Sequence, residues 1–138
     1  MAIQRTRNLF ISHSWKYGDA YTRLIKLLTA APRFSYRDYS VPKDDPVHNA
    51  PTPQALREAI KRQMVFCQVV VVVAGKYATY SDWIQEELLL AKGDFNKPVL
   101  AIKPFASTQV SSVVRSAADL FVNWSTSSIV GGIRELNP

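Results

Sequence analysis

Positions 69–73 hold five consecutive valines, and Ala74 extends this apolar run. An unbroken series of β-branched side chains predicts a strand that is buried on both faces, which is typical of the centre of a parallel sheet. Neighbouring parallel strands need a crossover connection, and that connection is usually a helix. The valine run therefore favours an α/β fold in which residues 69–74 form a central strand.

Strand-like and helical patterns alternate along the rest of the chain. Residues 21–28 carry apolar side chains at helical spacing, whereas residues 34–38 alternate apolar and polar side chains as a half-exposed edge strand does. The other expected strands are 8–12, 97–102 and 119–122. The other expected helices are 52–64, 81–91, 110–117 and 125–136. The alternation predicts one domain, residues 1–138, with a three-layer flavodoxin-like fold: a five-stranded parallel sheet in the order 2-1-3-4-5 with helices on both faces.

The composition is that of a soluble globular protein, with 47% hydrophobic and 20% charged residues. The valine run is far shorter than the ~20 residues that span a bilayer, and the polar residues 1–7 do not have the pattern of a signal peptide. The single cysteine, Cys67, excludes an intrachain disulfide and is expected in the core. We therefore expect a cytoplasmic protein without a membrane partner.

A formal net charge of +6 could indicate nucleic-acid binding. The 17 basic residues are scattered, however, and Lys61-Arg62 is the only adjacent pair. The sequence contains neither an Arg-rich block nor zinc-ligand spacing. We expect no specific nucleic-acid partner, and a basic surface that attracts small phosphate-bearing molecules.

The helix expected at 81–91 contains an unusual carboxylate. At about 100° per residue, Trp83, Ile84, Leu88 and Ala91 share one face, and Glu87 falls inside that face. A carboxylate on an apolar stripe costs several kcal/mol unless something compensates for it. Three interpretations remain open on periodicity alone: Glu87 belongs to a buried ion pair, it lies at the rim of the apolar stripe, or it is a catalytic group whose environment tunes it.

The carboxyl ends of the strands bind ligands in this fold, and here they lack the features of its common sites. Ser12-His13-Ser14 follows the first strand, where a phosphoacceptor domain has acidic residues and a flavodoxin has a longer phosphate loop. A Gly-x-Gly-x-x-Gly fingerprint and a nucleophile elbow are both absent. His13 and His48 are isolated, so no metal site is expected. The remaining hydroxyls, aromatics and Glu87 suit glycosidic-bond chemistry on a nucleoside-like substrate.

Three segments resemble Toll/interleukin-1 receptor (TIR) domains. Residues 8–14, Asn-Leu-Phe-Ile-Ser-His-Ser, are similar to the first strand of this family and the polar turn after it. Residues 81–88 are similar to its Trp-x-x-x-Glu-Leu helix, and Glu87 occupies the position of the catalytic glutamate. Residues 38–47 resemble the TIR-like branch typified by ThsB of the prokaryotic Thoeris anti-phage system.

The resemblance implies cleavage of the nicotinamide–ribose bond of NAD, which is a substrate here and not a cofactor. It also implies that Glu87 is catalytic and that a set of polar and aromatic side chains contacts the substrate. That set is Phe10, Ser12, His13, Ser14, Asp38, Ser40 and Trp83. The branch further implies a cyclic ADP-ribose-type product that signals to a partner effector, and we expect self-association through residues 40–51.

Two alternatives remain open. A non-catalytic TIR-like module would act only through protein contacts, and the presence of Glu87 four residues after Trp83 argues against it. A nucleoside deoxyribosyltransferase-like enzyme shares the fold and uses a glutamate nucleophile. Release of nicotinamide from NAD would identify the NAD-cleaving enzyme, whereas base exchange on a deoxynucleoside would identify the deoxyribosyltransferase.

Overall fold

The valine run forms β3 (Val69–Val73), the middle strand of a five-stranded parallel sheet. A computed structural model describes residues 6–12, 20–39, 52–73, 82–103 and 112–138. The other strands are β1 (Thr6–Ser12), β2 (Ser35–Asp38), β4 (Val99–Ile102) and β5 (Leu120–Val122). The order β2-β1-β3-β4-β5 confirms the predicted flavodoxin-like topology.

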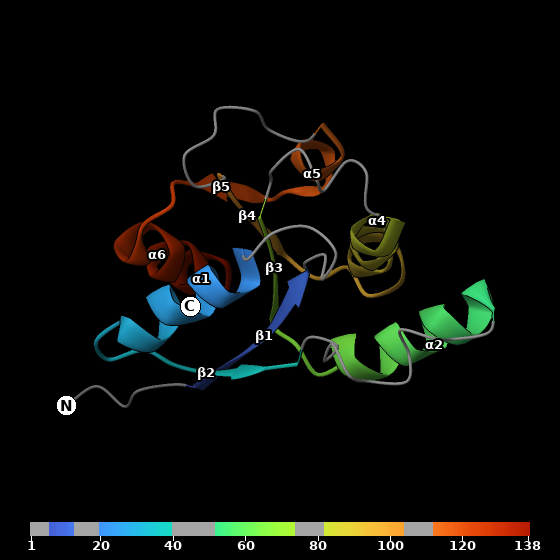
Figure 1. Cartoon of the computed structure of the whole chain (residues 1–138), viewed down its shortest axis with the longest axis horizontal. Helices are drawn as coiled ribbons and strands as arrows, with labels where there is room; N and C mark the ends of the chain where they lie inside the picture. The colour runs from blue at the N-terminus through green and yellow to red at the C-terminus, as the bar shows by residue number, and fades with distance from the viewer. Residues whose placement is uncertain (1–5, 13–19, 40–51, 74–81, 104–111) are drawn as a thin grey trace.

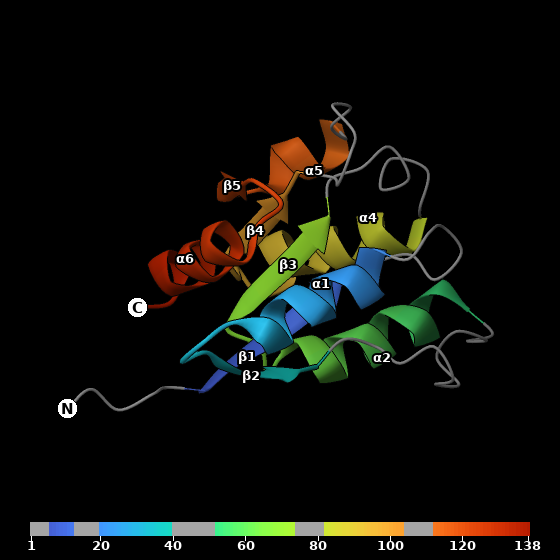
Figure 2. The ribbon, with the colours of Figure 1, turned by 60° about the vertical axis from the view of Figure 1, so that its left-hand side comes forward.

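Helices cover both faces of this sheet, as predicted (Figure 1). One layer consists of α1 (Ala20–Ala30) and α6 (Thr126–Leu136), which lie side by side in Figures 1 and 2. The other layer consists of α2 (Pro53–Met64), α4 (Asp82–Leu89) and α5 (Ser112–Ala117). Among the described residues, no helix is long and apolar enough to cross a membrane.

Strand alternation divides the core into two clusters. Successive side chains of a strand point to opposite faces, so Leu9 and Ile11 of β1 pack under α1 and α6. Phe10 of the same strand packs under α2 and α4. The valines of β3 and the apolar residues of β4 divide in the same way. Both faces of β3 and β4 are thus buried, which explains why these two strands contain no polar residue.

Side-chain hydroxyls cap the first turn of two helices. The Thr52 hydroxyl accepts a 3.0 Å hydrogen bond from the Ala55 N–H, and Pro53 occupies the first turn of α2. At α6, the Ser125 hydroxyl accepts a 3.1 Å hydrogen bond from the Ser128 N–H. Ser125, and not the neighbouring Thr126, is therefore the N-cap of α6.

The boundaries of three strands differ from the prediction. β1 begins at Thr6, two residues earlier than expected, because it pairs with β2 from Ser35 onward. β4 begins at Val99 and not at Lys97, since Pro98 has no N–H to donate to a strand ladder. β5 begins at Leu120, one residue later than expected, although the Asp119 N–H already donates a 2.9 Å hydrogen bond to the Val99 carbonyl.

The sequence pattern did not reveal that α4 continues directly into a π-helix, η2 (Leu90–Asp94). Its wider turn is closed by a 3.1 Å hydrogen bond from the Phe95 N–H to the Leu90 carbonyl. Asn96 then adopts a left-handed conformation, with φ of 49°, and the chain turns towards β4. Apolar spacing does not distinguish one π-helical turn from an α-helix, so this feature needed the three-dimensional structure.

Candidate active site

Glu87 lies on the face of α4 that packs against the sheet. Ile84, Leu88 and Ala91 share this face and are buried in the core, as their spacing predicted. Glu87 is buried among them, with only 1% of its surface exposed. The carboxylate is therefore withdrawn from bulk water into a largely apolar layer between α4 and the sheet.

Ser12 is the residue that meets Glu87 from the sheet. It ends β1, two positions after Phe10, so strand alternation directs its side chain towards α4. The Ser12 hydroxyl donates a 2.8 Å hydrogen bond to Oε1 of Glu87, and Ser12 itself is fully buried. A hydroxyl and a carboxylate thus form a polar pair inside an apolar region.

This pair lies at the position where flavodoxin-like folds bind ligands. From β1 the chain adds β2 on one side, and it then crosses to the other side of β1 to add β3 and the later strands. The order of the strands therefore reverses at β1, which is the topological switch point of the fold. Ser12 is the last residue of β1 and is paired in register with Val72 of β3. The Ser12–Glu87 pair is therefore found at the carboxyl edge of the sheet, next to the topological switch point.

Two other predicted site residues, Phe10 and Asp38, lie among the described residues. Phe10 is fully buried in the core cluster beneath α2 and α4, one strand pleat below Ser12. Asp38 is exposed at the end of β2, where it is level with Leu9 of β1. Ser12 lies three positions further along β1 than Leu9, which corresponds to about 10 Å along the strand.

The remaining predicted contacts fall outside the described residues. His13, Ser14 and Ser40 belong to such segments, as does the loop 40–51 that was expected to support self-association. Trp83 lies in the first turn of α4, but its side chain is not among those described. Within the described ranges, no three His, Cys, Asp or Glu side chains are grouped closely enough to hold a metal ion.

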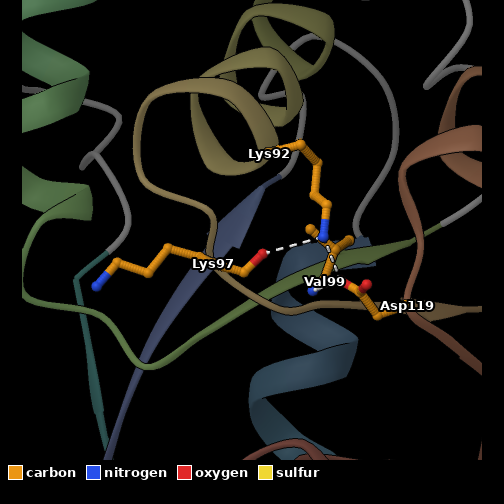
Figure 3. Close-up of polar contacts among 4 residues, drawn as sticks. All are labelled: Lys92, Lys97, Val99 and Asp119. Atoms are coloured by element: carbon orange, nitrogen blue, oxygen red, sulfur yellow. Dashed lines mark hydrogen bonds and ion pairs between the residues drawn. The ribbon is translucent and has the colours of Figure 1, made fainter.

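A polar network that sequence reasoning missed anchors the far end of the helix that carries Glu87 (Figure 3). Lys92 of η2 reaches Asp119, with 2.6 Å between Nζ and Oδ2. The same carboxylate oxygen accepts a 2.8 Å hydrogen bond from the N–H of Val99. Lys92 also donates to the carbonyl of Lys97 at 3.4 Å. The network joins η2 to the starts of β4 and β5.

The charge of Asp119 is favoured by this network. Partial burial acts to raise its pKa, but the hydrogen bonds from Lys92 and from the Val99 N–H outweigh that effect. The pKa of Asp119 therefore lies below its ordinary value. This carboxylate is structural, because both of its partners belong to the framework that supports α4.

Solved structures with the same fold have little sequence similarity to this chain. A protein of Burkholderia pseudomallei described as pilus assembly-related superposes with a TM-score of 0.56 at 11% identity, over 99% of this chain and 92% of the other. The response regulator domain of Thermotoga maritima CheB gives a TM-score of 0.53 at 13% identity, over 97% and 98% of the two chains. At such identities the similarity concerns the fold alone. A search among curated proteins found no significant match.

A family comparison is more specific. The family of the TIR-like domain of the Thoeris protein ThsB matches residues 10–109, which is most of the chain. This range begins in β1 and includes both Ser12 and Glu87. The TIR resemblance of the first strand, the loop and the Trp-x-x-x-Glu helix is thereby confirmed. The chain belongs to the ThsB TIR-like domain family.

Proposed function

We propose that this protein cleaves NAD at the nicotinamide–ribose bond, with Glu87 as the catalytic carboxylate. The observation that carries the proposal is the burial of Glu87 against Ser12 at the ligand-binding edge of the sheet. Burying a carboxylate in the core is costly even when it is hydrogen-bonded, and perturbed or buried titratable groups gather at functional sites. Membership of the ThsB TIR-like family supports the same assignment.

The chemistry needs one negative charge and little water. The bond between ribose C1′ and the pyridinium nitrogen breaks, and its electron pair leaves with nicotinamide, which departs as a neutral molecule. The ribose that remains has oxocarbenium character and requires a nearby negative charge. A carboxylate in a dry site supplies that stabilisation more strongly than one in bulk water does.

The fate of the ribosyl cation determines the product. Water gives ADP-ribose, whereas a nucleophile within the same molecule gives a cyclic ADP-ribose isomer. We propose cyclisation, because the withdrawal of Glu87 from bulk solvent favours an internal nucleophile over water. The cyclic product would then act as a diffusible signal for a partner effector in anti-phage defence.

The test is incubation with NAD followed by chromatography for nicotinamide, ADP-ribose and cyclic isomers. Wild type is compared with Glu87→Gln, which keeps the size of the side chain and removes its charge. We expect nicotinamide release by the wild type and a loss of at least about 100-fold in the variant. Circular dichroism and thermal unfolding of both proteins establish that the variant is folded. Equal turnover by the two proteins would overturn the proposal.

A wild type without activity should be tested again with extract from phage-infected cells, because a defence enzyme can require a trigger.

Deoxynucleosides offered with a free base form a parallel assay. Base exchange without nicotinamide release would identify a deoxyribosyltransferase instead.

Self-association through residues 40–51 predicts a specific activity that rises with enzyme concentration. A total activity that is strictly proportional to enzyme concentration would contradict it.

A further inference from the structure

The presence of a serine at the end of β1 is unexpected for packing. Side chains on the same face of β1, β3 and β4 include Phe10, Val70, Val72 and Ala101, all fully buried and apolar. An apolar side chain at position 12 would contribute favourable burial and would suit a strand better. A residue type that is unfavourable for packing at its position is found in proteins chiefly where function requires it.

The Ser12 hydroxyl has two possible uses, which are contact with substrate and control of Glu87. A hydroxyl has a single proton to donate, and in this structure that proton is directed to Oε1 of Glu87 at 2.8 Å. The hydrogen bond restricts the carboxylate to one orientation and favours its charged form. Contact with substrate through this proton would require the bond to break.

We infer that Ser12 is a positioning residue, whose hydroxyl holds the Glu87 carboxylate in the orientation and ionisation state that NAD cleavage requires. This inference rests on the proposed function. It replaces the sequence-based expectation that Ser12 contacts the substrate. A free glutamate side chain can rotate about three bonds, so a fixed partner on a rigid strand improves the placement of its charge.

Several described charged groups on elements around α4 have other partners or lie elsewhere. Five of them are Arg7, Lys61, Lys92, Asp94 and Arg115. Lys92 is held by Asp119, and Lys61 is paired with Asp94 at 2.9 Å. Arg115 of α5 is exposed, and Arg7 lies at the opposite end of β1 from Ser12. The Ser12 hydroxyl is a neutral donor on a rigid strand, and its hydrogen bond favours the ionised form of Glu87.

The experiment compares Ser12→Ala, which removes the donor, with Ser12→Thr, which keeps it. For Ser12→Ala we expect a kcat about 10- to 100-fold lower, as for the loss of a hydrogen bond to a charged group. The KM for NAD should change by less than about threefold, and the acidic limb of the pH–rate profile should move to higher pH. Ser12→Thr should restore most of the activity and the original pH limb.

Ser125→Ala is the matched control, because it removes a serine hydroxyl that caps α6 and does not contact α4. It should destabilise the protein while leaving kcat and the pH limb unchanged. Unfolding in urea is also measured for Ser12→Ala, Glu87→Gln and the double variant. Ser12→Ala should lower the unfolding midpoint more in the wild-type background than in the Glu87→Gln background. Only in the wild-type background does it remove a hydrogen bond to a charged acceptor.

These readouts separate the two proposals. A wild type that releases no nicotinamide, with or without cell extract, overturns the proposed function and this inference with it. An active wild type whose Ser12→Ala variant changes only in KM makes Ser12 a substrate contact and overturns the inference alone. The inference also fails if Ser12→Ala and Ser12→Thr lose activity equally while remaining folded, or if the unfolding effects of Ser12 and Glu87 are additive.

Discussion

Ser12 Oγ and Glu87 Oε1 lie 2.8 Å apart, although 75 positions separate the two residues in the chain. One residue ends the central strand β1, and the other lies in the second turn of the helix that follows β3. Both are withdrawn from solvent. The pair therefore depends on the packing of α4 against the sheet, and substitutions that loosen this packing should affect activity before they unfold the protein.

Glu87→Gln should separate activity from stability. If Glu87 is retained for catalysis, replacing its charge with a neutral amide of similar size should leave the free energy of unfolding unchanged or raise it by up to about 2 kcal/mol, because a desolvated charge is removed. Urea unfolding at neutral pH measures this. A loss of several kcal/mol would instead identify a structural ion pair, since breaking a buried pair costs about 3–5 kcal/mol.

The two adjacent glycines of α6 should respond in opposite ways to alanine. A Cβ added at Gly132 would lie 2.8 Å from Cδ1 of Leu100 and 3.1 Å from Cγ1 of Val122, whereas one added at Gly131 meets no atom within 4 Å. Gly131→Ala should stabilise the protein by about 0.5–1 kcal/mol through helix propensity. Gly132→Ala should be about 1–3 kcal/mol less stable than Gly131→Ala, because the packed side chains of Leu100 and Val122 must shift to make room. Thermal unfolding of the pair tests this, and equal effects would contradict the close packing.

Asp119→Asn should reduce stability at neutral pH and have little effect in acid. The folded pKa of Asp119 is lowered from its ordinary value of 3.8, so its contribution is complete above that pH and disappears as the pH falls through the lower, folded value. We expect a loss of about 1 kcal/mol or less, because Asp119 and Lys92 are both partly exposed. Urea unfolding of wild type and variant at neutral and acidic pH measures the difference.

The control for this prediction is Asp94→Asn. Asp94 forms a 2.9 Å ion pair with Lys61 on the surface, without a backbone donor comparable to the Val99 N–H. Its removal should have a smaller effect than Asp119→Asn at neutral pH, and added salt should weaken that effect. A larger effect from Asp94→Asn would show that the network in Figure 3 is not what anchors η2.

Cys67 should be unreactive in the folded protein. Burial raises the pKa of its thiol from 9.0 to about 11, and the charge of Lys97 offsets this only in part. Because the thiolate is the reactive form, this pKa difference alone should slow labelling by a thiol reagent at mildly alkaline pH about 100-fold relative to the unfolded chain. Labelling kinetics with and without denaturant measure the ratio. Fast labelling of the native protein would indicate local opening at the end of α2.

The fold was predictable because its signals are local. The valine run identifies a central parallel strand, and capping residues such as Thr52 set the start of a helix. Each depends only on side chains that are close in sequence. Helical periodicity also predicted that Glu87 lies on the buried face of α4, which the structure confirms. The bond between the Asp119 side chain and the Val99 N–H was not predictable, because it joins residues 20 positions apart.

The sequence by itself therefore determined the α/β architecture, the strand order and the burial of one carboxylate. Only the tertiary structure decided what that carboxylate contacts. Strand alternation fixes the face of β1 on which Ser12 lies, but the crossover geometry and the packing of α4 determine that Glu87 meets it there. The π-helical turn and the Lys92–Asp119 contact likewise join segments that are distant in sequence. No local pattern encodes such contacts, because they arise when separate elements dock on one sheet.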